Sequence, residues 1–281
     1  MSVWFVTGAS RGLGAEIVSA ALGRGHRVVA TARDAEVVLR TFPDKADSLL
    51  AASVDVTDQR QVQAAVEAAV ERFGRIDVLV NNAGRGLLSA VEEASDQAAR
   101  AVFDVNVFGV LNVQRAVLPT MRAQRSGHVL NMSSVGGFTT APGWGLYAAT
   151  KFALEGMSEA LRAELEPLGI HVTIVEPGGF RTDFLDGSSL HVEPPVIADY
   201  VSTAGVTRDI VAANNHLQRG NPVRLAAAII DLTETEKPPL RLQLGADSVA
   251  RIEAKLEQVG RELHEWRAVA VATDHDDVPA T

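Results

Sequence analysis

A tyrosine and a lysine four residues apart are the first side chains in this sequence that could do chemistry together. In Tyr147-Ala148-Ala149-Thr150-Lys151 the helical period places the phenol and the ammonium on one face. A nearby cation favours the phenolate and lowers the pKa of a phenol, so the pair predicts a general acid and base. The same spacing occurs by chance on many solvated helix faces, so other residues must support this interpretation.

A glycine-rich segment near the N-terminus could bind phosphate. Residues 7–14 have the sequence TGASRGLG, which follows a short apolar run and leads directly into a helical pattern. Glycines here permit a tight turn and a close backbone approach, and the first N–H groups of a helix attract a pyrophosphate. The positions of Gly8, Gly12 and Gly14 differ from the G-x-G-x-x-G fingerprint, and a plain turn is the alternative that the local context leaves open.

The end of the second apolar run bears on which nucleotide would fit. Sites that bind NAD usually carry an acidic residue there, whereas this sequence has Ala32 and Arg33. A guanidinium at this place, with Ser10 and Arg11 in the glycine turn, could bind the 2′-phosphate of NADP through charge-assisted hydrogen bonds. The sequence therefore favours NADP(H) over NAD(H). In the alternative interpretation, Arg33 is a solvated residue at a helix start and Asp34 contacts the ribose.

Composition and charge narrow the class of protein. The net charge of −9 lacks the basic excess that is typical of proteins that bind nucleic acid or anionic membranes. The absence of cysteine excludes disulfides and thiolate chemistry, and the histidines show no compact ligand spacing, so no metal is expected. The N-terminus lacks a signal-peptide pattern, and no apolar run approaches the roughly 18 residues of a membrane span. We therefore expect a soluble cytoplasmic protein without a nucleic-acid or membrane partner.

Short apolar runs alternate with longer amphipathic segments over most of the chain. This alternation predicts a single Rossmann-like, doubly wound parallel α/β sheet of about seven strands, with helices on both faces. Strands are predicted at residues 3–6, 28–32, 52–56, 76–80, 128–132, 171–175 and 240–244. Helices are predicted at residues 12–23, 58–73, 97–121, 147–168, 222–233 and 247–271, the last of which is a C-terminal extension.

Two segments depart from this alternation. Residues 183–221 mix Gly, Ser, Pro and apolar residues without a clear period, which is typical of a loop or lid over a substrate site. Residues 273–281 are polar and acidic and are expected to fray. No repeat, low-complexity linker or shift in composition marks a second domain. Residues 1–281 are therefore expected to form one dinucleotide-binding and catalytic domain.

Further motifs accompany the glycine turn and the Tyr/Lys pair. The segment 81–84 reads Asn-Asn-Ala-Gly, Asn106 follows within the next predicted helix, Ser134 lies thirteen residues before Tyr147, and Pro177-Gly178 ends the strand predicted at 171–175. In this order and at this spacing, the motifs resemble the classical short-chain dehydrogenase/reductase family. The resemblance is strong over about residues 1–185 and loose beyond them.

The resemblance implies a role for each matching catalytic residue. Ser134 is expected to hydrogen-bond the substrate oxygen, Tyr147 to give or take the hydroxyl proton, and Lys151 to lower the pKa of the phenol and hold the nicotinamide ribose. Asn106 resembles the asparagine that anchors a water-linked proton relay. Ser133 is the rival for the role of Ser134, but the interval to Tyr147 and the Val-Gly-Gly that follows favour Ser134.

The resemblance also implies a set of contacts to NADP(H). Asp55 resembles the acidic residue beside the adenine, the 81–84 turn resembles the segment that closes over the cofactor, and Thr182 is expected to bond the carboxamide or phosphates. For the turn at Pro177, a plain strand-ending turn is the alternative. The predicted cofactor set is Gly8, Ser10, Arg11, Gly12, Leu13, Gly14, Arg33, Asp55, Val56, Asn82, Ala83, Gly84, Tyr147, Lys151, Pro177, Gly178, Gly179, Phe180 and Thr182.

The predicted activity is hydride transfer between NADP(H) and a carbonyl or secondary alcohol, with Tyr147 as general acid and base. Apolar residues in the loops near the nicotinamide end predict an apolar small-molecule substrate; they are Leu87, Leu88, Val135, Phe138, Trp144, Phe184 and Leu185. One alternative is a non-catalytic NADP(H) sensor, which has no physical need for Ser134, Tyr147 and Lys151 together. A sugar-nucleotide epimerase or dehydratase is another, but it would show a different glycine spacing and a larger C-terminal part.

Two features bear on self-association. The family resemblance implies a homodimer or homotetramer formed through the helices predicted at residues 97–121 and 147–168. In the C-terminal helix, apolar residues recur at steps of three and four, namely Val249, Ile252, Leu256, Val259, Leu263 and Trp266. This stripe is shorter than the roughly three to four heptads of a coiled coil, so packing on its own domain is favoured over a dimer seam.

Overall fold

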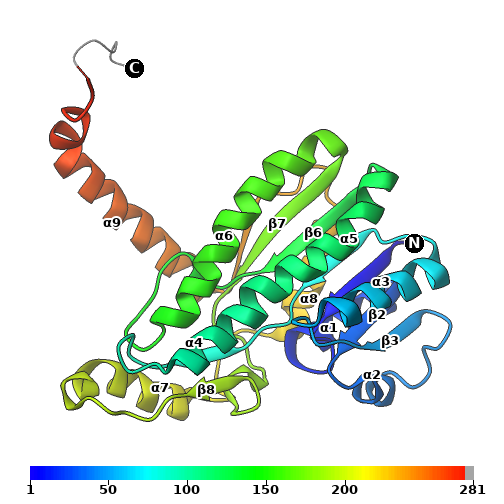
Figure 1. The fold of residues 1–281 in the computed structure, drawn as a ribbon, viewed down its shortest axis with the longest axis horizontal. Coiled ribbons are helices and arrows are strands. Elements are labelled where there is room, and N and C mark those ends of the chain that lie inside the picture. Colours follow the sequence, from blue (N-terminus) through cyan, green and yellow to red (C-terminus); the bar gives the residue numbers. More distant parts are fainter. Residues whose placement is uncertain (276–281) are drawn as a thin grey trace.

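The computed structural model describes residues 1–275 as an α/β fold around one parallel sheet (Figure 1). Seven strands form the sheet in the order β3-β2-β1-β4-β6-β7-β9, and every neighbouring pair is parallel. Their bounds are β1 Val3–Thr7, β2 Arg27–Ala32, β3 Leu49–Ser53, β4 Val78–Asn81, β6 Gly127–Met132, β7 Ile170–Pro177 and β9 Arg241–Leu244. The predicted fold class is confirmed.

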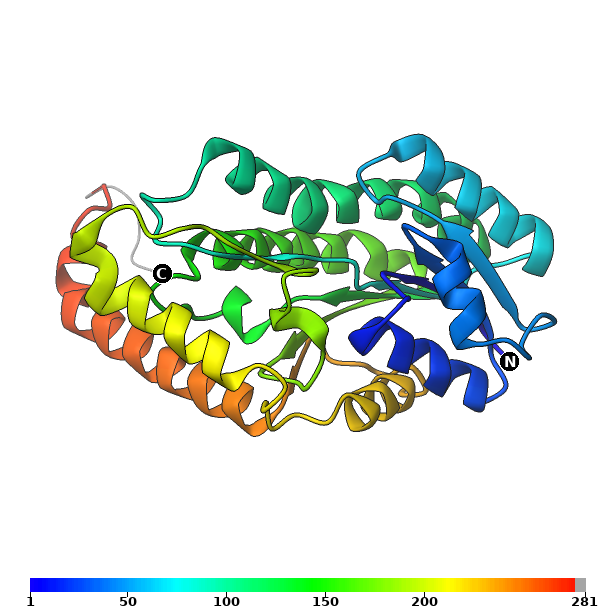
Figure 2. The same ribbon diagram turned by 90° about the horizontal axis from the view of Figure 1, so that it is seen from below.

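Helices cover both faces of the sheet, as Figure 2 shows. On one face α1 and α8 pack against side chains such as Trp4 and Val6, and on the other α3 and α5 pack against side chains such as Phe5 and Leu79. The helices are α1 Gly12–Gly23, α2 Ala35–Thr41, α3 Gln59–Phe73, α4 Asp96–Phe103, α5 Val110–Gln124, α6 Gly145–Leu165, α7 Val206–Asn214, α8 Pro222–Thr233 and α9 Ala246–Val271. The alternation of strand side chains between the two faces gives each face its own core.

Several elements differ from the sequence-based expectation. Strand β3 begins three residues before the predicted 52–56, because Val54 and Val56 are buried beyond the sheet rather than in it. The helix predicted at 97–121 is divided into α4 and α5 by a π-helical turn over Asp104–Gly109. The short helix α2 was not predicted, since its seven residues include only one buried side chain, Val38.

The segment 183–221 is more regular than its composition predicts. It contains strand β8 Leu190–Val192, which pairs with β5 Gly86–Leu88 in a small second sheet, and helix α7. The carboxylate of Glu93 accepts hydrogen bonds from the backbone of Val196 and Ile197 and a 2.6 Å bond from Arg208 on α7. These contacts, led by that of Arg208, lower the pKa of Glu93 to about 2. The segment is thus fastened to the loop that precedes α4.

The helical run Asp96–Gln124 is long and apolar enough, by length and composition, to cross a membrane. Its second half nevertheless packs on the sheet, because Val113, Val117 and Met121 belong to the buried core. The apolar character of this run is therefore explained by its packing in the core of the fold.

Helix α9 leaves the body of the molecule (Figure 1). Of its 26 residues only Ser248 and Ile252 are buried. The expected packing of this helix on its own domain is therefore wrong for most of its length. The predicted frayed tail at 273–281 lies largely outside the described residues.

Candidate active site

The glycine turn lies at the carboxyl end of β1, where the strand order reverses between β1 and β4. Gly8 and Gly12 have φ of +66° and +56°, a left-handed conformation that favours glycine. A Cβ on Gly14 would collide with the carbonyl oxygen of Gly8 and the side chain of Asn82. The backbone of the turn is therefore free to approach a ligand, and the N-terminus of α1 opens directly from it.

Residues at the end of β4 hold the glycine turn in place. The Thr7 hydroxyl accepts hydrogen bonds from the backbone N–H groups of Asn82 and Ala83, both at 3.0 Å. The Asn82 amide donates to the carbonyl oxygens of Thr7 and Gly8 at 2.9 and 3.0 Å. The predicted Asn-Ala-Gly segment thus braces the turn while its outer surface faces the cleft.

A single cleft of about 1060 Å³ joins the glycine turn to the Tyr/Lys pair. All residues of the predicted cofactor set line it except Gly14, which supports the turn from behind. Among the predicted substrate-side residues, Val135, Trp144, Phe184 and Leu185 line it as well. Leu87, Leu88 and Phe138 do not. The two leucines are buried at 1% exposure in β5, where Leu87 packs against α4. Their assignment to the pocket was wrong.

The charged residues proposed for the adenosine end take different orientations. Arg33 lines the cleft and is exposed at the end of β2. Arg11 donates instead to the Ser188 carbonyl oxygen at 3.0 Å and the Ser189 hydroxyl at 2.7 Å. Asp34 caps α2 by accepting from the N–H of Glu36 at 3.0 Å. Arg33 is therefore the better placed of the two arginines for a 2′-phosphate.

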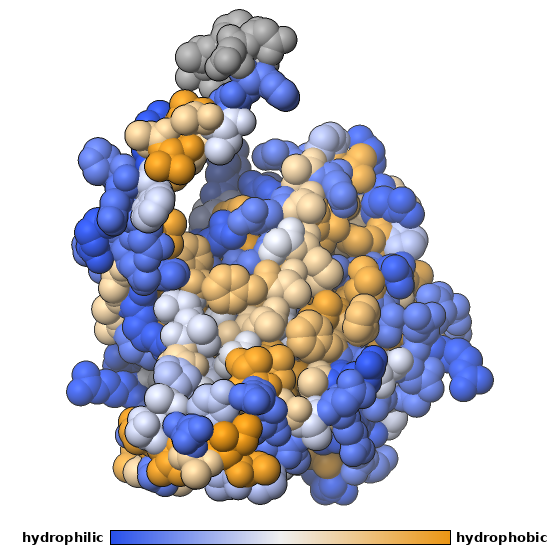
Figure 3. Space-filling model, turned by 60° about the vertical axis from the view of Figure 1, so that its left-hand side comes forward, coloured by the Kyte–Doolittle hydropathy of each residue, from blue (hydrophilic) through white to orange (hydrophobic). Residues whose placement is uncertain are grey.

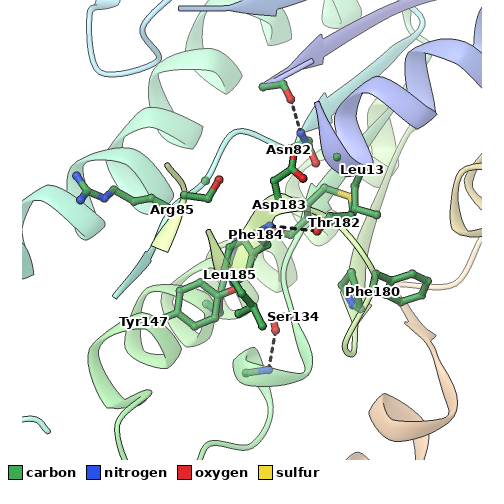
Figure 4. Close-up of a pocket in the computed structure, with 18 of the residues that line it drawn as sticks. Leu13, Asn82, Arg85, Ser134, Tyr147, Phe180, Thr182, Asp183, Phe184 and Leu185 are labelled. Atoms are coloured by element: carbon green, nitrogen blue, oxygen red, sulfur yellow. Dashed lines mark hydrogen bonds between the residues drawn. The ribbon is translucent and has the colours of Figure 1, made fainter. Parts of the chain in front are cut away.

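Ser134 and Tyr147 meet at the other end of the cleft. Ser134 caps the turn after β6, since its Oγ accepts from the N–H of Gly136 at 3.0 Å. A Cβ on Gly136 would lie 3.4 Å from both Ser134 Oγ and the Tyr147 ring, so the two side chains flank the same small residue. Figure 4 shows them on one side of the pocket beside Phe184 and Leu185. The rings of Tyr147 and Phe184 lie 5.7 Å apart between centroids.

Lys151 reaches the same end from one turn further along α6. Its Nζ donates to the carbonyl oxygen of Met132 at 2.8 Å and lies 5.8 Å from the centroid of the Tyr147 ring. Burial lowers the pKa of Lys151 to about 8, and the carboxyl group of Glu155 opposes that fall. Burial also raises the pKa of Tyr147 to about 12, and the Ser134 side chain opposes that rise. Near neutral pH the site therefore holds a neutral phenol beside a cation.

Asn106 lies in the π-helical turn and does not line the cleft. Its side-chain oxygen accepts from the N–H of Arg85 at 2.9 Å, and its Nδ2 donates to the Arg85 carbonyl oxygen at 2.9 Å and to Thr150 Oγ1 at 3.0 Å. Thr150 in turn donates to the carbonyl oxygen of Tyr147 at 2.6 Å. Asn106 thus braces the helix that carries the pair. π-helical turns often occur at functional sites.

A buried acidic cluster beneath Ser133 was missed from the sequence. Glu155 and Glu176 share Arg241, whose Nε lies 3.1 Å from Glu155 and 3.4 Å from Glu176. Burial and the neighbouring Glu176 raise the pKa of Glu155 to about 7, while the hydroxyl of Ser133 and Arg241 oppose the rise. The Ser133 hydroxyl therefore faces this cluster, although Ser133 lines the cleft as well. Ser134 is the serine that flanks Gly136 together with Tyr147. Only the i+4 spacing of Glu155 from Lys151 could have hinted at the cluster.

Two further contacts also escaped the sequence. The carboxylate of Asp247, at the start of α9, accepts from the N–H of Gly179 at 2.7 Å. Asp183, Asp186 and His216 bring potential metal-ligand atoms within 4.8 Å of one another, although their spacing along the chain gave no such signal. Asp186 already bonds Asn215 at 2.6 Å and His216 at 3.1 Å, so it is engaged within the lid segment.

Comparison with known proteins agrees with this geometry. Residues 2–192 match the family model for short chain dehydrogenase. The curated oxidoreductase BOA17 of Botryotinia fuckeliana is 38% identical over 96% of this chain and 98% of its own length. The 3-ketodihydrosphingosine reductase of Bacteroides thetaiotaomicron is 36% identical over 85% of this chain and 86% of its own length. The chain belongs to the short-chain dehydrogenase/reductase family.

Solved structures support the same assignment. A short-chain dehydrogenase from Streptomyces avermitilis is 42% identical and superposes with a TM-score of 0.89, covering 98% of this chain and 100% of that one. Two more distant members were solved with a bound nucleotide. The protein from Burkholderia cenocepacia, at 28% identity, is in complex with NADP, and that from Brucella melitensis, at 26% identity, is in complex with NADH. Both nucleotides thus occur among relatives of this fold. The chain is accordingly an oxidoreductase of a family that acts on small molecules.

Proposed function

We propose that this protein transfers a hydride between NADP(H) and an apolar ketone or secondary alcohol, with Tyr147 as general acid and base. The observation that carries the proposal is the convergence of Ser134, Tyr147 and Lys151 at one end of a cleft whose other end is a glycine turn. A sensor would need the turn but not this convergence.

The residues around the turn fit a dinucleotide. A side chain at Gly14 would displace the turn, and the left-handed Gly8 and Gly12 open its backbone N–H groups toward the cleft. Arg33, Asp55 and Val56 line the end suited to adenosine, and Lys151 and Thr182 the end suited to nicotinamide. The nicotinamide, when bound, supplies or accepts the hydride.

The protein's own residues donate and accept the proton of the substrate oxygen. In the reducing direction, the Ser134 hydroxyl donates a hydrogen bond to the carbonyl oxygen and stabilises the negative charge that develops on it. The neutral Tyr147 phenol gives its proton to that oxygen, and the Lys151 ammonium stabilises the phenolate left behind. In the oxidising direction the Tyr147 phenolate, stabilised by the Lys151 ammonium, accepts the alcohol proton. Asn106 and Thr150 keep the helix of the pair in position.

The preference for NADP(H) rests on charge at the end of β2. No carboxylate follows Ala32 directly, and the next acid, Asp34, is occupied as the cap of α2. Arg33 is the group in reach of a 2′-phosphate, and its guanidinium would pair with that phosphate through charge-assisted bonds.

The preference for an apolar substrate rests on the lining around Tyr147. Trp144, Phe184 and Leu185 surround the phenol, and Ile210 and Val211 of α7 line the cleft as well. A relative that reduces a 3-ketodihydrosphingosine, as its name states, provides an example of a long apolar ketone. Burial of an alkyl chain here contributes about 0.8 kcal/mol per CH₂.

A substrate panel tests the proposal. Ketones of graded alkyl length are incubated with enzyme and either NADPH or NADH, and nucleotide oxidation is followed by absorbance. We expect turnover that rises with alkyl length and is faster with NADPH. A panel without turnover, although NADPH binds, would favour the sensor.

A further inference from the structure

Helix α9 is an amphipathic helix that the described chain leaves uncovered. Among its residues only Ser248 and Ile252, in the first two turns, are buried. Figure 3 shows apolar side chains on the projecting helix and a hollow between it and the body. Most helical stability in proteins comes from packing an apolar face, and the apolar face of α9 is largely unpacked in the described chain.

The exposed apolar residues of α9 follow one seam. Leu256, Val259, Leu263 and Trp266 are 56%, 46%, 62% and 61% exposed and recur at steps of three, four and three. This is the a/d pattern of helices that pair with knobs in holes. Scattered apolar residues on a surface need no partner, but a continuous seam does.

We propose that α9 pairs with α9 of a second copy in antiparallel orientation, about a two-fold axis beside Arg261. In this register Leu256 lies opposite Trp266 of the second copy, and Val259 lies opposite Leu263 of the second copy. All four residues of the seam are then covered by one another. A two-fold axis makes the contact closed, so it ends at two helices.

The residues on the Gly260 flank of the seam fit this register. Glu253 lies opposite Arg267 of the second copy, and the symmetry repeats this pair of opposite charges. Gly260 lies next to the axis, where a Cβ would meet nothing within 4 Å in the isolated chain and where a small residue permits close approach. On the other flank of the seam, Glu262 lies opposite Glu262 of the second copy. The two Glu253–Arg267 pairs and the small Gly260 therefore favour the antiparallel arrangement on one flank only.

The pairing would reach the active site through the base of α9. Asp247 bonds the N–H of Gly179, and the Ser248 hydroxyl donates to the carbonyl oxygen of Glu176 at 2.8 Å. Asp247 and Arg251 both line the cleft. The paired helices hold this base in a fixed direction and so restrain the turn that follows Pro177.

Single cysteines test the register, because the full chain has none of its own. In G260C the two cysteines lie about 3 Å apart along the axis, and in V249C about 36 Å apart. With a short bismaleimide reagent we expect G260C to form covalent dimers and V249C to remain monomeric on denaturing gels. Absence of G260C dimers would overturn the pairing, and V249C dimers would show a parallel pair instead.

Charge reversal tests the flanking pair in the G260C background. We expect E253R and R267E each to lower the association constant, measured from the dependence of cross-linking on concentration, by about fivefold or more. The double variant E253R/R267E restores the opposite charges and is expected to return to within about twofold of the parent. A double variant as weak as the sum of its singles would contradict the antiparallel register.

Discussion

Burial decides the protonation of the two central side chains. Burial raises the pKa of Tyr147 to about 12 and lowers the pKa of Lys151 to about 8, so near neutral pH the phenol is neutral while the lysine still carries its charge. Such a phenol is a ready proton donor but a poor base, so oxidation of an alcohol depends on added positive charge nearby.

Arg33 offers the sharpest test of nucleotide choice. Arg33→Ala should weaken NADPH binding by about 10- to 100-fold and leave NADH binding within about twofold, because only NADPH carries the phosphate that the guanidinium pairs with. Fluorescence titration with both nucleotides measures this. Equal losses for the two would place recognition of the phosphate elsewhere.

Glu155 should make folding stability depend on pH. Its pKa in the folded protein, about 7, exceeds the unfolded value of about 4.5, so the folded state retains a proton that the unfolded chain releases. The stability that Glu155 contributes is fully present below about pH 4.5 and is lost as the pH rises through about 7. Glu155→Gln should gain about 1–3 kcal/mol relative to wild type between pH 5 and 8. The free energy of unfolding is measured with urea at each pH. A difference between the two proteins that stays constant from pH 5 to pH 8 would contradict the raised pKa of Glu155.

At the scale of elements, the bounds of a helix could be predicted from the sequence where residues next to its first turn determine where it begins. Helices α1 and α8 have their predicted bounds because a glycine turn precedes one and Asn221-Pro222 begins the other. Helix α7 could not be predicted, because none of its residues is buried and its anchor is Glu93, 115 residues before Arg208. The acidic cluster of Glu155, Glu176 and Arg241 likewise exists only through tertiary contacts.

The glycine turn should tolerate no side chain at Gly14. Gly14→Ala should weaken nucleotide binding at least about tenfold and lower the melting temperature, since the new Cβ meets backbone that cannot move freely. Gly23→Ala on the same helix is the matched control, as nothing lies within 4 Å of its Cβ. It should bind nucleotide normally. Similar behaviour of the two variants in titration and melting would mean that the turn is not tightly packed.

Arg11 should fasten the lid segment. Arg11→Ala removes the bonds to Ser188 and Ser189, so chymotrypsin should cut sooner at Phe184 or Leu185. Arg24→Ala, which removes a surface ion pair with Asp231, is the control and should be cut at the wild-type rate. Mass spectrometry of the fragments identifies the sites. Unchanged cutting in the Arg11 variant would show that other contacts hold the segment.

At the scale of the whole molecule, one cleft and one projecting helix lie at the same end of the sheet. The cleft combines residues from nearly every loop at the carboxyl edge of the strands, which is where ligands bind in folds of this type. Helix α9 starts at that edge and carries the proposed contact to a second copy. Its apolar stripe is visible in the sequence, but the projection of most of the helix from its own domain became apparent only in three dimensions.

The central claim is that Tyr147 moves the substrate proton. The most direct measurement compares Tyr147→Phe with wild type in kcat for the best ketone of the panel and in affinity for NADPH. We predict a loss of kcat of about 100-fold or more, with NADPH affinity within about twofold, since only the hydroxyl is removed. A variant that keeps wild-type kcat would contradict the account.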